Sequence, residues 1–119
     1  MKLMPGDICR FRRSNGRYGF SRVLSIDDDP RLGVIYSLEK FNVHTTEPVS
    51  AEDADDVEEL KTLPRNGHFP IVEARVLEVA PKRIGHMPVA AGDLEGYAIW
   101  REAFDAGEGG VFTIPLEEI

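Results

Sequence analysis

Alternating apolar and polar residues dominate the N-terminal part of the chain and predict β-structure there. Strand-like runs cover Ile8–Arg13 and Tyr18–Ile26, and a third run covers Leu32–Phe41. The dipeptide Asn15-Gly16 lies between the first two runs. It is typical of a two-residue type I′ turn, because both central residues of that turn need positive φ. We therefore expect a three-stranded antiparallel meander at the start of the fold.

Two helices are expected further along the chain. The first helix is short and acidic and spans Ala51–Leu60. Ser50 before it and Asp53 in its first turn resemble a capping box. The second begins at Asp93, and Gly107 is placed to end it in the left-handed conformation that glycine tolerates. Its stripe of residues recurs at spacings of three and four and consists of Leu94, Tyr97, Trp100, Arg101 and Phe104.

The second half of the chain also predicts two strands. The run Phe69–Val79 is rich in β-branched residues and indicates a more buried strand, after a loop over Pro64–Gly67. Pro81 ends this strand, and a loop continues through Gly92. A last short strand is expected over 111–114. The pattern predicts one mostly β (α+β) domain over residues 1–119, built on an antiparallel, strongly twisted sheet with one short acidic and one C-terminal aromatic helix.

A turn at Asn15-Gly16 fixes the register of the first hairpin, so that Phe11 faces Phe20 and Cys9 faces Arg22. Side chains alternate between the faces of a sheet. This register puts an aromatic set on one face: Cys9, Phe11, Tyr18, Phe20, Leu24 and Ile26. The other face carries Arg10, Arg12, Gly19 and Ser21. Because platforms for single-stranded nucleic acid need cations and rings on one surface, the separation argues against that function.

The arginines of this hairpin have two possible roles. Arg22 falls on the aromatic face, diagonal to Asp7, and a buried charge without a partner would be costly. We expect a structural Asp7–Arg22 pair, with a binding role for Arg22 as the alternative. Arg10, Arg12 and Arg17 form a solvated surface or contact a partner.

Composition and charge restrict the class of protein. The chain has 119 residues, 42% of them hydrophobic and 29% charged, which is ordinary for a globular domain. Its net charge of −7 argues against a general nucleic-acid binder. The single cysteine excludes an intramolecular disulfide, and no apolar run is long enough for a membrane helix or a secretory signal. We expect a cytoplasmic protein.

Acidic residues gather in the middle of the chain, where they form a solvated face or mimic nucleic-acid charge toward a basic partner. The candidates for such a contact are Glu52, Asp53, Asp55, Asp56 and Glu59. Trp100 belongs to the core stripe of its helix and is also the candidate apolar anchor of an interface.

No catalytic or metal-binding pattern emerges from the sequence. Cys9 could act as a nucleophile with His44, His68 or His86 as base, but no spacing brings these residues together. The histidines form no recognised ligand pair either. We expect no cofactor and no enzymatic activity, and a small hydrolase is a distant alternative.

The segment PGDICRFRRSNGRYGFSRVLSI resembles the immunity protein 26 family of bacterial polymorphic toxin systems, and the tail GYAIWREAFDAGEGGVFTIPLEEI is similar to the end of some members. The resemblance implies a mostly β fold and a non-enzymatic role, in which the protein binds and neutralises a cognate toxin. We expect that toxin to be a nuclease or another basic protein, whose active site would be occluded by acidic and apolar surface. The resemblance implies no particular contact residues. The N-terminal pattern also opens SH3-like barrels, so a module that binds nucleic acid or peptide through Arg10, Arg12 and Arg17 is the alternative.

Overall fold

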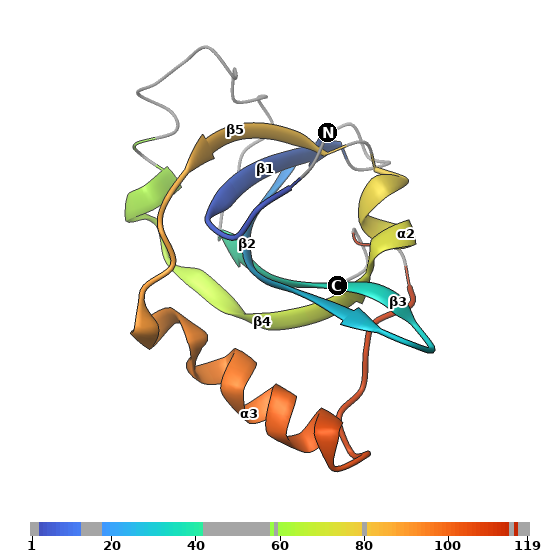
Figure 1. The fold of residues 1–119 in the computed structure, drawn as a ribbon. Coiled ribbons are helices and arrows are strands. Elements are labelled where there is room, and N and C mark those ends of the chain that lie inside the picture. The colour runs from blue at the N-terminus through green and yellow to red at the C-terminus, as the bar shows by residue number, and fades with distance from the viewer. Residues whose placement is uncertain are drawn as a thin grey trace.

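Five antiparallel strands make up the central sheet of this computed structural model (Figure 1). They are β1 (Asp7–Arg12), β2 (Tyr18–Asp29), β3 (Gly33–Phe41), β4 (Arg65–Val72) and β5 (Lys82–His86). The order across the sheet is β4-β3-β2-β1-β5, so the first three strands form the expected meander. The structure describes residues 3–12, 18–41, 58, 60–79, 81–114 and 116, with only the backbone of Arg12 and Asn66. The predicted mostly β fold is confirmed.

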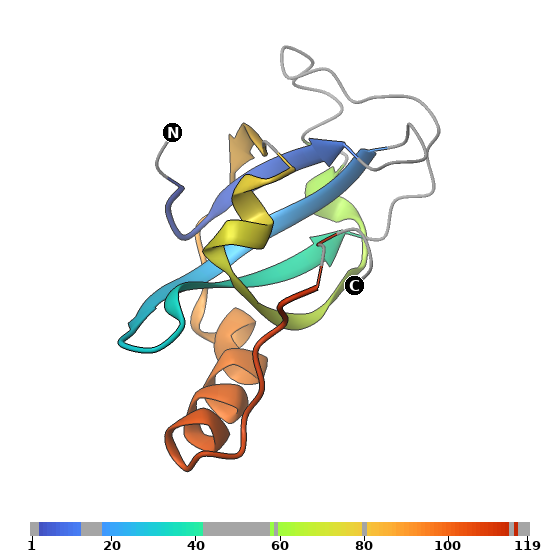
Figure 2. The same ribbon diagram turned by 90° about the vertical axis from the view of Figure 1, so that its right-hand side faces the viewer.

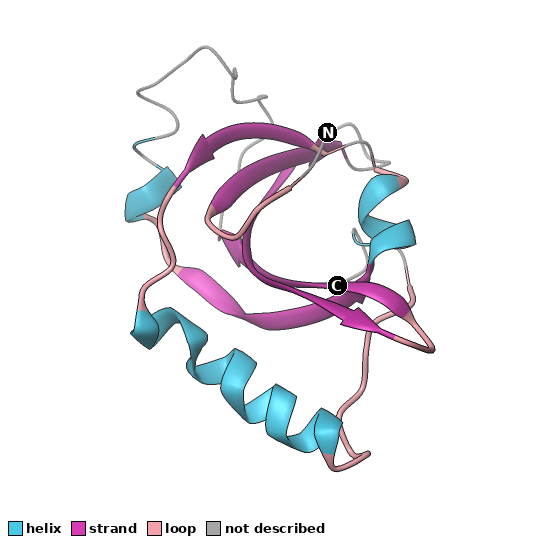
Figure 3. Cartoon of the chain, in the orientation of Figure 1, coloured by secondary structure: helices cyan, strands magenta, loops and turns pink. Residues whose placement is uncertain are grey.

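Helices cover both faces of the strongly curved sheet (Figures 1 and 3). Helix α2 (Glu73–Leu77) follows β4 directly, and the 3-10 turn η1 (Ala91–Leu94) leads into α3 (Glu95–Asp105). Figure 2 shows α3 at one end of the molecule, with the chain returning along it toward β4 after the helix ends.

The two faces of the sheet bury separate apolar clusters. The first cluster includes Val76 of α2 and consists of Leu3, Cys9, Phe11, Val23, Tyr36, Leu38, Ile71, Val76 and Leu116. The second consists of Ile8, Phe20, Phe41, Leu60 and Ile84. Since both faces are covered, polar side chains of the central strands are buried as well, which explains why Arg22 is only 1% exposed.

The register of the first hairpin differs from the prediction by one residue. Cys9 pairs with Ser21 and Phe11 pairs with Gly19, so paired numbers sum to 30 where the two-residue turn required 31. A shift of one residue moves one strand's side chains to the opposite face. Phe11 and Phe20 therefore lie in different clusters, and the expected aromatic pair does not form. The turn itself, at 13–17, lies outside the described residues.

Gly19 gives a physical reason for this register. The Phe11 ring lies directly over Gly19, and a Cβ atom added there would overlap the ring. The observed pairing therefore uses the missing side chain of Gly19 to seat Phe11 in the first cluster.

Three predictions for the second half of the chain are wrong. The expected strand Phe69–Val79 ends at Val72 and continues as α2, because its later residues favour a helix and bury only Val76. Strand β4 begins at Arg65, inside the expected loop. Strand β5 replaces part of the loop before Gly92, and its burial pattern contains one buried residue, Ile84.

The helices agree better with expectation. Helix α3 forms, and Gly107 adopts φ +81° at its end, as predicted. Asp93 accepts a hydrogen bond from the Ala90 N–H at 2.9 Å and stabilises η1 before the helix. Of the acidic helix, Glu58 and residues 60–62 are described and helical, and Leu60 is buried. The expected strand over 111–114 is reduced to one parallel bridge between Phe112 and Ile71.

Candidate functional site

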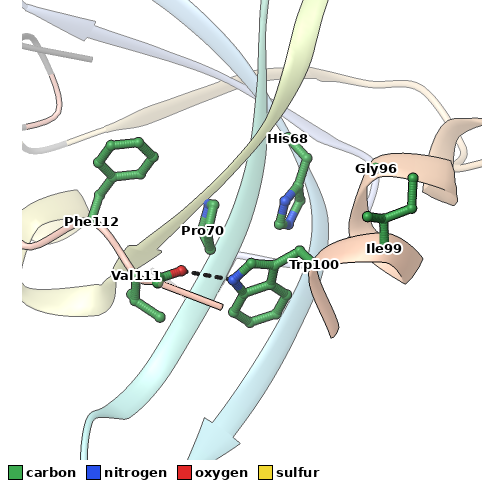
Figure 4. A pocket seen from close by; sticks show the side chains of 8 residues that line it. His68, Pro70, Gly96, Ile99, Trp100, Val111 and Phe112 are labelled. Atoms are coloured by element: carbon green, nitrogen blue, oxygen red, sulfur yellow. Dashed lines mark hydrogen bonds between the residues drawn. The ribbon is translucent and has the colours of Figure 1, made fainter. Parts of the chain in front are cut away.

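A groove lies between α3 and the outer edge of β4. Its volume is about 600 Å³, and most of its lining is apolar. The lining residues come from β4, α3 and the segment after α3 (Figure 4): His68, Pro70, Gly96, Ile99, Trp100, Gly110, Val111 and Phe112. This size is in the range of pockets that take a small ligand or a protruding side chain of a partner.

The sequence at the edge of β4 explains why a groove forms there. Pro70 has no N–H to donate to a further strand, and such a residue is usual on an edge strand. Phe112 covers part of this edge by donating its N–H to Pro70 O at 2.7 Å and accepting from the Val72 N–H at 3.2 Å. Gly96 of α3 lies against the His68 side chain, so a Cβ there would be 3.0 Å from the His68 Cβ. The hollow remains between these two contacts.

Trp100 forms a rigid wall of the groove. Its indole nitrogen donates a hydrogen bond to Gly110 O at 2.7 Å (Figure 4). The ring stacks on Phe104 with a centroid distance of 4.9 Å, and only 9% of the residue is exposed. These contacts tie α3 to the returning chain, so the predicted anchor residue is fixed in the groove.

His68 lies half-buried beside Trp100, with ring centroids 5.3 Å apart. Burial lowers the pKa of His68 to about 4, so the imidazole is neutral near pH 7. Its Nε2 is buried and has no hydrogen-bond partner among the described residues. His68 therefore contributes a largely apolar wall to the groove, and its inaccessible nitrogen is poorly placed for proton transfer.

Exposed carboxylates occur on α3, which forms one wall of the groove, and just after its end. Ile99 is 73% exposed, and the acidic residues of α3 and its end are also exposed: Glu95, Glu102, Asp105 and Glu108. Arg101 is the single cation of α3, and it is held 3.1 Å from Asp105 Oδ1 and 3.8 Å from Asp27 Oδ1. The exposed surface of α3 is therefore mostly negative, and it carries an exposed isoleucine that also lines the apolar groove.

A buried ion cluster centred on Arg22 holds the chain leading to α3 against the sheet. Arg22 Nε lies 2.7 Å from Glu39 Oε1, and its NH2 lies 3.0 Å from Asp93 Oδ2. Its NH1 donates to the backbone oxygens of Met87 and Pro88 at 3.2 and 3.3 Å. This arrangement is the structural role of Arg22, because a side chain 1% exposed cannot contact a partner directly.

The expected Asp7–Arg22 pair is wrong, because each of the two side chains has other partners. Asp7 Oδ1 lies 3.2 Å from His86 Nδ1 and 3.9 Å from Arg83 NH1, and Asp7 Oδ2 accepts from the Met4 N–H at 2.9 Å. Arg22 instead meets Glu39 across the β2–β3 pairing, where the two residues are direct neighbours. The hairpin register alone could not reveal this, since Glu39 lies on the third strand.

The corrected register brings arginine and aromatic residues together. Arg10 pairs with Phe20, so these two side chains share a face, and the backbone of Arg12 pairs with that of Tyr18. The Arg10 guanidinium lies 4.6 Å from the centroid of the Tyr18 ring. The predicted separation of cations from rings is therefore wrong. The Arg12 side chain and Arg17 lie outside the described part of the structure.

The remaining predicted contact residues are not placed by the structure. Glu52, Asp53, Asp55, Asp56 and Glu59 fall outside the described residues. Sequence reasoning missed Ile99, although the signal was available. Ile99 directly precedes the buried Trp100 and so lies off the buried stripe of an amphipathic helix, where an isoleucine is expected to be exposed.

The described part of the chain carries no metal-binding cluster and no membrane-spanning helix. No group of three or more His, Cys, Asp or Glu side chains in the described part could hold a metal ion. None of its helices is long and apolar enough to span a membrane. Comparison of the chain with protein-family models, curated proteins and solved structures gave no match. The geometry of the groove therefore carries the functional argument.

Proposed function

We propose that this chain is a non-enzymatic, immunity-type protein that binds and neutralises a cognate bacterial toxin in the cytoplasm of the producing cell. The observation that carries the proposal is the apolar groove between α3 and β4, together with the exposed carboxylates of the helix that forms one of its walls. The N-terminal and C-terminal resemblances to the immunity protein 26 family point to the same role.

The geometry suits recognition of a protein surface. Interfaces combine buried aromatic or aliphatic anchors with a polar rim, and most of the binding energy comes from the anchors. Here Trp100 and Phe112 provide apolar surface, and the carboxylates provide a field that favours a basic partner. Complementary charge accelerates encounter and excludes wrong partners. A basic nuclease domain has the required charge, because it must itself bind phosphates.

Co-expression tests the proposal directly. The protein is expressed with the C-terminal domain of the product of the gene immediately upstream, and growth is compared with expression of that domain alone. We expect relief of toxicity and a stable one-to-one complex in size-exclusion chromatography. Unrelieved toxicity together with no complex would refute the proposed function.

The contact between Arg10 and Tyr18 favours a second candidate, an SH3-like module that binds nucleic acid or peptide. The strand order, in which β1 lies between β2 and the last strand, fits such a barrel. Binding through Arg10, Arg12 and Arg17 should weaken steeply as salt is added, because phosphate contacts release counterions. Binding of a labelled oligonucleotide that is absent or insensitive to salt would exclude the nucleic-acid form. Unchanged peptide binding after replacement of these arginines by alanine would exclude the peptide form.

A further inference from the structure

We propose that the exposed face of α3, centred on Ile99, is the docking surface for the toxin, and that the toxin contributes an apolar side chain flanked by cationic side chains. This inference rests on the proposed function and names the surface that performs it. The predicted acidic segment around Glu52–Glu59 is the competing surface.

Two glutamates flank Ile99 on the exposed face of α3. Glu95, Ile99 and Glu102 are separated by four and three residues, so they lie on one face of the helix. All three are exposed, and Ile99 also lines the groove. One apolar side chain is thus bracketed by two carboxylates about one helical turn away on either side.

The buried side of the same helix makes this face rigid. Trp100 is fixed by its bond to Gly110 O, and the Tyr97 hydroxyl donates to Asp27 Oδ1 at 3.0 Å on β2. The chain preceding the helix is held through Asp93 by Arg22. A preorganised surface loses little conformational entropy on binding, and this favours affinity.

Charge selects the class of occupant. A second copy of this chain docked symmetrically by the same face would bring Glu95 and Glu102 of both copies together, and like charges disfavour that contact. An anionic membrane surface is disfavoured for the same reason. A basic protein surface meets both requirements, because its cations pair with the carboxylates while an apolar residue enters the groove beside Ile99.

The test measures binding of the C-terminal domain of the upstream gene product, with its activity disabled, to the full chain by surface plasmon resonance. Three variants change the exposed face of α3 beside the groove and are called the groove variants: Ile99→Ala, Glu95→Gln and Glu102→Gln. Matched controls are Leu77→Ala, an aliphatic residue that is 51% exposed, and Glu78→Gln, both at the end of α2. Helix α2 packs on the first cluster and lines no part of the groove. Glu78 contacts Arg75, whose Nε donates to Thr113 O at 2.7 Å, and glutamine keeps a side-chain oxygen that can accept from Arg75.

We expect Ile99→Ala to weaken binding by about 30-fold, the loss at which an interface residue counts as a hot spot. The two glutamate variants should slow association and reduce its dependence on salt, because they remove part of the steering field. The α2 controls should bind within about twofold of the unmodified protein, the range of an energetically neutral surface substitution.

The following results would overturn the inference and leave the proposed function standing. One is unchanged binding of all three groove variants; another is loss of binding when Glu52, Asp53, Asp55, Asp56 and Glu59 become their amides while the groove variants bind normally. A dimer of the unmodified chain that Ile99→Ala dissociates would also overturn it, in favour of a second copy. If the upstream domain does not bind the unmodified protein at all, the proposed function fails and the inference fails with it.

Discussion

Replacing Arg22 by methionine tests whether the buried ion cluster stabilises the fold and the position of α3. Methionine retains an unbranched apolar chain that ends about where Nε of arginine lies, and it removes the charge and all donors. In the native protein the guanidinium contacts Glu39 at 2.7 Å, Asp93 at 3.0 Å and two backbone oxygens. The substitution leaves Glu39, whose side chain is 8% exposed, without its main counter-charge.

The size of the effect follows from that geometry. Removing one partner of a buried ion pair costs about 3–5 kcal/mol, mostly because the other charge remains buried. Arg65 Nε lies 3.5 Å from the same Glu39 oxygen and offers partial compensation. We therefore expect a loss of about 3 kcal/mol, at the lower end of that range. The partly exposed pair of Lys61 and Glu58 is the control, and Lys61→Met should cost about 1 kcal/mol or less.

The loss of unfolding free energy caused by Arg22→Met should be larger at neutral pH than at acidic pH. Burial raises the pKa of Glu39 above its ordinary value of 4.5, against the opposing effect of Arg22. Removing Arg22 raises this pKa further. A carboxyl with a raised pKa binds more protons in the folded state than in the unfolded state, so stability falls as pH rises from 4.5 through the folded pKa. The difference between Arg22→Met and the unmodified protein should therefore shrink on acidification.

Urea unfolding followed by fluorescence of Trp100, the one tryptophan of the chain, measures this effect. The titrations are run at about pH 7.5 and at about pH 4, because the change begins at the ordinary value of 4.5 and extends upward from it. The double variant Arg22→Met/Glu39→Gln should recover part of the lost stability, because no uncompensated carboxylate remains at position 39. A loss below about 1 kcal/mol for Arg22→Met, or a loss that Glu39→Gln does not reduce, would refute the reasoning.

Three further predictions concern single buried features. Gly19→Ala should cost about 1–3 kcal/mol in urea unfolding, because its Cβ overlaps the Phe11 ring; unaltered stability would contradict the observed register. Burial raises the pKa of Cys9 to about 12, so iodoacetamide at about pH 8 should label it slowly until the protein unfolds; rapid labelling of folded protein, measured by mass spectrometry, would contradict this burial. Burial lowers the pKa of His68 from 6.5 to about 4, so the folded state binds fewer protons and stability should fall as pH drops between these values. His68→Gln should flatten that slope in urea titrations at several pH values, and an unchanged slope would show that His68 is not its source.

The meander could be predicted because it depends on local alternation, whereas the register could not. The pairing of Arg12 with Tyr18 leaves five residues between them, and a symmetric two-residue turn requires an even number. This small difference reversed which face of β1 meets the rings of β2. The conclusion about arginines and aromatics changed with it, although each strand was correctly located.

The elements missed in the second half had little periodic signal. Strand β5 contains one buried apolar residue, Ile84, and is ordered mainly by pairing with β1. Helix α2 sits inside an apolar run that also suits a strand, and packing of Val76 on the first cluster favours the helix. The groove could not be predicted because it depends on long-range contacts: residues of β4, of α3 and of the segment after α3 line it together. The burial of Trp100 on its helix was predictable from the spacing of the stripe, but its position beside His68 was not.

Substitutions at Arg22 and Ile99 distinguish two ways of weakening toxin binding: loss of the fold that supports the α3 surface, and loss of a direct contact. Arg22 is buried and can affect binding only by releasing the chain that leads into α3. Its substitution should lower binding and stability together, and binding should recover with the part of the stability that Glu39→Gln restores. Ile99 is exposed and makes little contribution to the core, so its substitution should weaken binding at unchanged stability. If the α3 surface only held the fold together, substitution of Ile99 would also lower binding and stability together, as expected for Arg22.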